Sequence, residues 1–400
     1  MSPSAQGLQN QLNGLLRFCS KNQMIVNELK TKIMIFGKPN VIPEFTFNNK
    51  ILDIVQEYKY LGVVFNSVKT LKGDIFKNMK THIADKARKA CFAVLKKYSS
   101  VKRLPPMSAC QLFDSHVSSV LNYAADIWGH CKEIPVIESV HYKFLKHNLG
   151  VKETTSNVAT LVDFGRYPMY IIHTIKIVKY WNRLIDIEDH KLVKKAYNTL
   201  LNLHNSGFQC WPSKVESILN SNNLDSCWNS QSSLDEQAME TLKLKIKNDF
   251  KHKWDKEMQT SPILRTYINF KCSFQTEAYL YEIKDYRLRR PVAQFRLSSH
   301  RLKVETGRHV YPKIDLENRI CELCNLNKVE DELHFLFYCP LYQDDRICFF
   351  INLLREQIEI DASAPFDLLR DIFNSDNNKV HFYFAKFVHK AFNRRQLVLG

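Results

Sequence analysis

Four residues near the carboxyl end of the chain have types and a spacing suited to binding a metal ion. The pattern is Cys321-x2-Cys324-x9-His334-x4-Cys339. Two thiolates separated by two residues can hold one ion from a tight turn, and a His and a Cys five positions apart can supply the other two tetrahedral ligands. Sulfur donors with one imidazole favour Zn²⁺ over Mg²⁺ or Ca²⁺. All four positions are filled, so the pattern predicts a structural zinc site; the alternative is coincidence, in a chain with 11 Cys and 14 His.

A basic segment directly precedes this cluster. Residues 284–309 hold eight Lys and Arg against two acids, a net charge of +6. Arginine dominates, and its planar guanidinium matches phosphate better than a point charge does. The segment therefore predicts a nucleic-acid contact, and the alternative is a solvated helix face. The arginines expected to contact phosphate are Arg287, Arg289, Arg290, Arg296, Arg301 and Arg308.

The whole chain is also basic. Its 400 residues include 57 Lys and Arg against 41 Asp and Glu, a net charge of +16, which favours a polyanionic partner such as nucleic acid. No apolar run approaches the roughly 18 residues that a membrane span needs. The first residues lack the basic and apolar regions of a secretory signal, and the eight cysteines outside 321–339 are scattered. We expect a reduced, nuclear or cytoplasmic protein that does not enter a membrane.

Hydrophobic periodicity predicts mainly helices. From about residue 70, apolar side chains recur every three or four positions. Gly150 is placed to end one helix, and Ser233 with Glu236 forms a capping-box pattern before another, whose apolar face carries Met239, Leu242, Ile246 and Phe250. Before residue 70, Asn48-Asn49 predicts a tight hairpin, and residues 31–36 and 58–65 are strand candidates.

Several ordered stretches support a family resemblance. Residues 8–36 end in Thr31-Lys-Ile-Met-Ile-Phe36, Tyr58-Lys-Tyr-Leu-Gly62 follows, and residues 75–129 end in Leu121-Asn-Tyr-Ala-Ala-Asp-Ile-Trp-Gly129. Later come Phe164-Gly-Arg-Tyr-Pro168, Ser299-His-Arg-Leu302 and the Cys/His cluster with Cys339-Pro-Leu-Tyr342. In this order they resemble motif D, motif E, the thumb, the region after it and the zinc region of a non-LTR (LINE-type) retrotransposon reverse transcriptase.

The resemblance implies roles for several residues. Lys30 or Lys32 would stand at the motif D lysine near the departing pyrophosphate, and Gly62 would permit the close backbone approach of a primer-grip turn. Thumb residues Lys86, Arg88 and Lys89 would contact the backbone of a primer–template duplex. Solvated lysines are the alternative for each charged position. The palm aspartates that hold two Mg²⁺ ions in this family lie upstream of motif D, so Mg²⁺ is expected only with a complete palm.

One short sequence imitates an active site. Tyr342-Gln-Asp-Asp345 matches the Y-x-D-D of reverse transcriptases, but a tight hairpin between apolar strands is required there and a helical pattern follows here. We therefore expect no catalytic residue in this chain, and whether it takes part in enzymatic activity stays open.

The predicted fold is a mainly α multidomain protein with a small α+β N-terminal remnant of a polymerase palm and a C-terminal zinc knuckle. The expected function is binding of RNA, DNA or an RNA–DNA hybrid by a truncated reverse transcriptase that does not polymerise alone. The alternatives are the C-terminal half of an active RNA-directed DNA polymerase and an inert remnant or protein-interaction scaffold. The expected regions are 1–66 (partial palm), 67–150 (thumb-like), 151–219 (connector), 220–233 (linker), 234–310 (basic helical), 311–345 (zinc knuckle) and 346–400 (helical tail).

Overall fold

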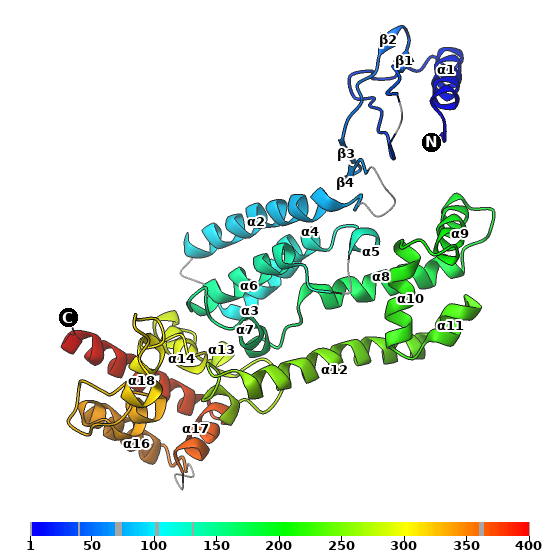
Figure 1. Ribbon diagram of the computed structural model, residues 1–400. Coiled ribbons are helices and arrows are strands. Elements are labelled where there is room, and N and C mark those ends of the chain that lie inside the picture. The colour runs from blue at the N-terminus through cyan, green and yellow to red at the C-terminus, as the bar shows by residue number, and fades with distance from the viewer. Residues whose placement is uncertain are drawn as a thin grey trace. The chain divides into compact units, whose positions relative to one another are not determined.

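The computed structural model describes residues 2–38, 41–68, 74–100, 104–129, 132–359 and 364–399 (Figure 1). These residues are mainly helical and include four short strands, which confirms the mainly α prediction. The chain divides into two compact units. One comprises Met1–Lys86, Tyr123–His130 and Lys176–Ser233, and the other comprises Ala87–Asn122, Cys131–Ile175 and Leu234–Gly400. The seven-region division made from the sequence stays a prediction.

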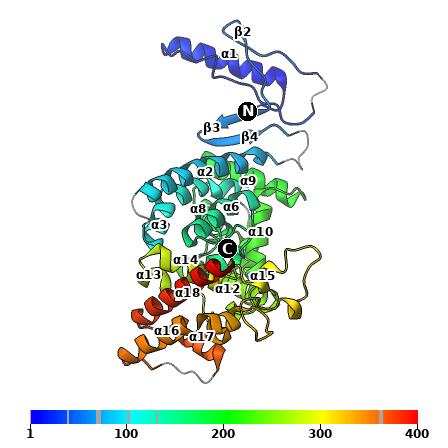
Figure 2. The ribbon, with the colours of Figure 1, turned by 90° about the vertical axis from the view of Figure 1, so that its left-hand side faces the viewer.

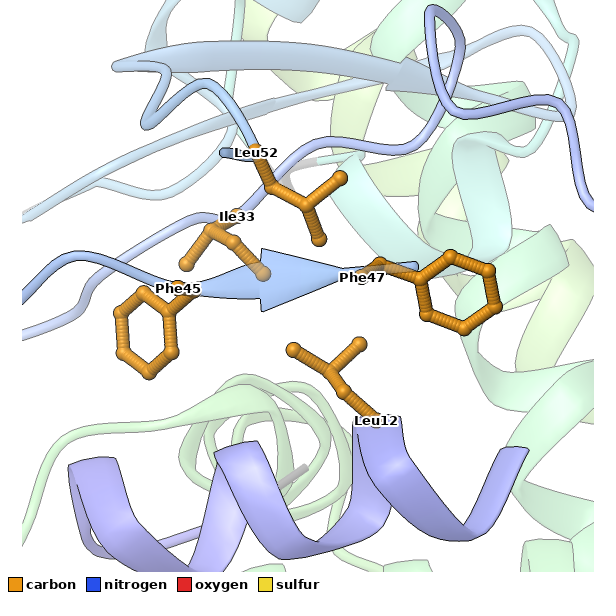
Figure 3. Close-up of a cluster of buried hydrophobic side chains, with 5 residues drawn as sticks. All are labelled: Leu12, Ile33, Phe45, Phe47 and Leu52. Atoms are coloured by element: carbon orange, nitrogen blue, oxygen red, sulfur yellow. The ribbon is translucent and has the colours of Figure 1, made fainter. Parts of the chain in front are cut away.

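The N-terminal part of the first unit has a very small core. Helix α1 (Ala5–Lys21) packs against β1 (Thr46–Phe47), which pairs antiparallel with β2 (Lys50–Ile51). Asn48 and Asn49 both have positive φ, as a tight hairpin requires, and this confirms the predicted turn. Residues 31–36 form only an isolated bridge, between Ile33 and Ile54, instead of the predicted strand. The buried cluster consists of Leu12, Ile33, Phe45, Phe47 and Leu52 (Figure 3).

A second hairpin replaces the single strand predicted over residues 58–65. Strands β3 (Glu57–Tyr60) and β4 (Val63–Asn66) are antiparallel and turn at Leu61 and Gly62, whose φ angles are 47° and 85°. The Tyr123 hydroxyl donates to the Leu61 carbonyl, and a Cβ on Gly62 would lie 3.0 Å from the Tyr123 ring. Glycine is therefore needed at residue 62 for its backbone angle and for this close approach.

The rest of the first unit is helical, and α2 and α8 contribute residues to both units. Residues 220–233, predicted to be a linker, contain helix α11 instead. Its Trp228 is buried, with its ring 6.3 Å from that of Trp181. The helices of this part are α2 (Lys77–Ser100), α5 (Ala125–Trp128), α8 (Met169–Ile185), α9 (Leu192–Asn205), α10 (Trp211–Ser221) and α11 (Asp225–Ser230).

The second unit contains the longest helix, α12, and the C-terminal helices. Its main helices are α3 (Pro106–Phe113), α6 (Pro135–Leu149), α7 (Asn157–Asp163), α12 (Glu236–Thr260), α14 (Tyr286–Arg296), α16 (Gln343–Arg355), α17 (Pro365–Asn374) and α18 (Asn378–Leu399). The short helices and helical turns are η1 (Asp114–Ser118), α4 (Ser119–Leu121), η2 (Tyr267–Asn269), α13 (Tyr279–Glu282), α15 (Lys303–Thr306), η3 (Leu316–Asn318), η4 (His334–Tyr338) and η5 (Pro340–Tyr342). Figure 2 shows α18 lying beside α16, and α18 also contacts α14.

Two helix ends test the sequence predictions directly. Gly150 adopts a left-handed conformation (φ 70°) and ends α6, as predicted. Asp235, and not Ser233, caps α12, because its side chain accepts a hydrogen bond from the Ala238 N–H. The predicted apolar face of α12 is confirmed, because each of its four members is buried: Met239, Leu242, Ile246 and Phe250.

A buried ion cluster lies at the centre of the second unit. The Arg296 guanidinium on α14 is 3.2 Å from Asp163 of α7 and 2.7 Å from Glu277, and Glu277 also pairs with Lys271. The four charges balance. Although burial opposes it, Asp163 and Glu277 raise the pKa of Arg296, so the guanidinium stays charged. The guanidinium carbon of Arg296 lies 4.8 Å from the ring centroid of Phe270 and 4.5 Å from that of Phe373.

Removing this cation should destabilise the protein strongly. In Arg296→Met, two buried carboxylates would be left with one counter-charge, and breaking such a buried pair costs about 3–5 kcal/mol. Urea denaturation followed by circular dichroism measures the loss. Arg287→Met on the same helix is the control, because that side chain is 85% exposed and should change stability by less than about 0.5 kcal/mol. Equal midpoints for the two variants would contradict this role.

A buried carboxylate caps α8. The two Glu138 oxygens accept from the backbone N–H groups of Met169 and Tyr170 at 3.0 and 2.8 Å. Burial nevertheless raises the pKa of Glu138 to about 7. The folded state therefore holds a proton that the unfolded state releases near its ordinary pKa, and this stabilisation is lost as the pH rises through about 7.

The free energy of unfolding should therefore fall from about pH 5 to about pH 8 in the wild type, by about 1.4 kcal/mol for each unit of pKa difference. Glu138→Gln removes the titration and should show a flatter profile. Chemical denaturation across this range compares the two proteins, and parallel profiles would show that Glu138 does not carry the dependence.

Candidate metal centre and basic surface

The four predicted metal ligands come together in the second unit. The ligand atoms of Cys321, Cys324, His334 and Cys339 all lie within 4.8 Å of one another, and Cys324 Sγ is 3.4 Å from His334 Nε2. Three sulfur atoms and one imidazole nitrogen around one point form a donor set that fits a metal ion such as zinc. The residues could therefore hold a metal, which the sequence spacing had predicted.

Local backbone structure places each pair of ligands. Ile320 and Val329 form an antiparallel bridge, and the Cys321 N–H donates to the Lys328 carbonyl at 2.8 Å, so the chain from Cys321 to Cys324 enters a tight knuckle. His334 is the first residue of η4, which is one turn of π-helix, and Cys339 follows its last residue. Asp331 accepts from the His334 N–H at 2.7 Å and fixes the start of that turn.

Burial changes the pKa of two of the ligands. Burial, followed by the charges of Cys339 and Glu330, raises the pKa of the Cys321 thiol to about 12. Burial lowers the pKa of His334, so its imidazole is neutral and able to act as a ligand. A divalent ion would offset the repulsion among three thiolates, because metal binding takes deprotonated Cys and neutral His.

Two buried glutamates connect the ligand loop to the rest of the unit. Glu332 accepts from the Arg265 guanidinium at 2.8 and 3.0 Å and lies 3.0 Å from His300 Nε2. Glu330 forms a two-bonded ion pair with Arg395 of α18, both bonds being 2.8 Å. Each glutamate stands between Cys324 and His334 in the chain, so the ligand loop is fastened to α18 and to the segment that carries His300.

A basic surface lies where α6 meets α14. Arg290 donates to the Gly150 carbonyl at 3.3 Å, and Arg287 lies one turn away on the same exposed face of α14. Lys152 donates its backbone N–H to Ser299 Oγ and its ammonium to the His300 carbonyl, both at 2.8 Å. Burial, with a further contribution from nearby Arg301, lowers the pKa of Lys152. We call Lys152, Arg287, Arg290 and Arg301 the α6–α14 basic surface.

Three of the arginines predicted to contact phosphate have other partners. Arg296 is fully buried in the ion cluster, and Arg289 is buried with its guanidinium on the Ile283 and Lys284 carbonyls at 2.6 and 3.1 Å. Burial removes these two from the predicted nucleic-acid set. Arg308 is only partly exposed and donates to the Pro262 carbonyl at 2.8 Å.

The remaining predicted positions lie elsewhere. In the first unit, Lys30 is exposed, Lys32 is paired with Asp53, and Gly62 stands in the β3–β4 turn. On α2, the exposed side chains of Lys86, Arg88 and Lys89 follow the buried positions Met79, Ile83 and Ala84. Arg88 and Lys89 belong to the second unit, whereas Lys30, Lys32, Gly62 and Lys86 belong to the first. Their roles stay predictions.

The Y-x-D-D sequence lies on a helix. Asp344 and Asp345 stand in the first turn of α16, and Asp345 accepts from Arg394 at 2.8 Å. The hairpin that reverse-transcriptase chemistry requires is replaced here by a helix start, where acids are favoured by the helix dipole.

Sequence reasoning missed Lys152, Glu330 and Glu332. Lys152 is 147 residues from its partner Ser299, and no local pattern predicts such a contact. The two glutamates did offer a signal, because charged residues between metal ligands often orient the ligand loop.

No family model, curated protein or solved structure matches this chain. Among the described residues, no helix is both long and apolar enough to cross a bilayer.

The metal centre predicts about one bound ion per chain, lost when a ligand is removed. Cys324→Ser keeps the size of the side chain but removes a thiolate, so its metal content, measured by elemental mass spectrometry on purified protein, should fall to near zero. Cys348→Ser, which changes an exposed cysteine outside the cluster, should keep the full content. Equal metal content in the two variants would contradict the assignment.

Proposed function

We propose that this chain binds RNA or an RNA–DNA duplex, that its Cys/His centre holds a structural Zn²⁺, and that it descends from the C-terminal part of a non-LTR retrotransposon reverse transcriptase. One observation carries the proposal: the metal centre and the basic surface share the segment 299–301. His300 contacts Glu332 of the ligand loop, Ser299 and His300 hold Lys152, and Arg301 is exposed beside them.

Zinc is the ion that this donor set favours. Three thiolates and an imidazole are soft or borderline ligands, and they can complete a tetrahedral site that leaves no position for a reactive water. Zn²⁺ bound here would hold the ligand loop, and through Glu330 and Glu332 the loop would hold α18 and the segment 299–301. The segment 299–301 would then hold Lys152 and Arg301 in position to contact a ligand.

The chemistry of the basic surface favours phosphate. Arg287 and Arg290 are spaced three residues apart on one helical face, and Lys152 and Arg301 extend the surface beyond Gly150. Contacts of this kind neutralise backbone phosphates and carry little sequence information. Binding should therefore be tolerant of sequence and strongly dependent on salt. The chain alone should not polymerise, because the palm carboxylates of the resembling family have no counterpart in this sequence.

The test compares two triple variants of equal charge change. Arg287→Gln, Arg290→Gln and Arg301→Gln together should weaken binding to a fluorescent RNA hairpin and reduce the slope of log affinity against log salt by about three. The control combines Lys253→Gln, Lys256→Gln and Arg370→Gln, exposed positions with acidic neighbours in Asp255, Glu257 and Asp367. It should leave the slope unchanged.

Equal slopes in both variants would contradict the α6–α14 basic surface as the binding site. Absence of binding by the wild type at low salt would contradict nucleic-acid binding altogether and would favour the protein-interaction scaffold.

A second function is favoured by the N-terminal part of the first unit. Its main buried cluster is small, whereas Phe18, Ile25, Leu29 and Phe36 are exposed, and exposed apolar side chains can be covered by another polypeptide. This favours the alternative in which the chain works as the C-terminal part of an RNA-directed DNA polymerase. An in-frame Asp-Asp motif upstream in the transcript, with extension of a primer in Mg²⁺ when both parts are expressed together, is the expected result. Continued inactivity of the combined protein would contradict it.

A further inference from the structure

One loop next to the metal centre displays an aromatic side chain. Residues 307–314 follow α15 and form a closed loop, because the Ile314 N–H donates to the Gly307 carbonyl at 3.1 Å. The Arg319 guanidinium closes the same end, with two bonds to the Ile314 carbonyl at 3.0 and 2.8 Å. We call residues 307–314 the Tyr311 loop.

The base of the Tyr311 loop is fixed. Arg319 is buried, and a Cβ on Gly307 would lie 2.9 Å from its side chain, so the backbone and the guanidinium pack closely. Arg308 folds back onto the Pro262 carbonyl at 2.8 Å. The Arg319 carbonyl also accepts from the Glu330 N–H at 2.9 Å, which ties the loop to the metal-ligand loop. The tip is therefore held on a fixed support.

The tip itself is exposed from His309 to Lys313. Tyr311 has a relative exposure of 102% and Val310 of 45%, whereas Tyr267, Tyr279 and Tyr342 of the same unit are buried. Burial of apolar surface stabilises a protein by about 25 cal/mol per Å², and an exposed tyrosine ring does not contribute this stabilisation. An apolar tip on a short, closed surface loop is typical of a binding element.

The charge around the ring indicates the partner. No acid lies between Thr306 and Ile314, and the tip carries His309 and Lys313 beside the ring. An aromatic face near a lysine matches an unpaired nucleotide, because the base stacks on the ring while the ammonium contacts a phosphate. A protein partner usually covers a broader apolar surface than the one ring and one valine that this tip exposes, so a nucleotide is the better match.

We propose that the Tyr311 loop is a stacking contact for an unpaired base of single-stranded RNA or DNA. The inference rests on the proposed nucleic-acid binding and specifies part of its ligand: a single strand, or the unpaired end of a duplex. The ring supplies stacking, and Lys313 supplies a sequence-independent phosphate contact.

The experiment measures binding of the full chain to fluorescent oligo(dU) and to a blunt RNA duplex by anisotropy. Tyr311→Ala should weaken binding of the single strand by about 5- to 150-fold, the range expected for one lost base-stacking contact, and should leave duplex binding unchanged. Tyr311→Phe and Tyr311→Trp keep a stacking face and should bind the single strand as the wild type does. Tyr281→Ala is the matched control, because Tyr281 on α13 is 54% exposed but precedes Glu282.

The outcomes separate this inference from the proposed function. Unchanged single-strand binding in Tyr311→Ala, with wild-type affinity for both ligands, overturns the stacking contact and leaves the proposed function intact. Equal weakening for single strand and duplex, or equal weakening in Tyr281→Ala, also overturns it. A wild-type protein that binds neither ligand overturns both, and the loop is then better explained as a protein contact.

Discussion

The second unit depends on one buried cation. Arg296 stands on α14 among two carboxylates and several aromatic rings, and only a fully compensated guanidinium is stable in such a place. Its two carboxylate partners come from α7 and from the chain before α13, so satisfying one charge fixes the position of three segments. These contacts fix the orientation of α14 about its own axis, so that Arg287 and Arg290 face solvent. The chain after Arg296 then leads to Ser299 and His300.

The same segment then links the metal centre to the basic surface. Glu332 lies among Arg265, Thr266 and His300. Burial raises the pKa of Glu332, but the hydrogen bond from His300 and the charge of Arg265 outweigh burial and lower this pKa to about 2. A carboxylate held ionised in this way fastens the ligand loop with charge-assisted bonds. Glu330 does the same for α18 through Arg395. A metal ion would thus order the C-terminal part of the unit at several points beyond its four ligands, as ligand-supporting residues do in other metal sites.

Much of this could be predicted from short-range pattern. The metal ligands, the Asn48-Asn49 turn, the αL position of Gly150 and the buried face of α12 each follow from residue types at fixed spacing. The burial of two arginines also follows from their spacing. Arg289 and Arg296 stand three residues before and four after buried Val292, so helical periodicity places them on its face.

What the sequence could not provide was contact between distant segments. Lys152 enters the basic surface through Ser299, and Asp163 reaches Arg296 across 133 residues. Cap choice was also ambiguous, because Ser233 and Asp235 both suit an N-cap and only the path of the chain into α12 selects Asp235. The short N-terminal strands differ from prediction for a related reason, since strand pairing depends on neighbours rather than on local propensity.

If a bound metal orders the module that presents the phosphate-binding surface, removal of the metal should weaken binding to RNA. The most direct measurement is the affinity of the full chain for a fluorescent RNA hairpin at low and physiological salt, first as purified, then after removal of metal by a chelator, and finally after addition of Zn²⁺. We expect salt-sensitive binding that weakens on chelation and returns with Zn²⁺. Binding of unchanged strength in the metal-free protein would contradict it.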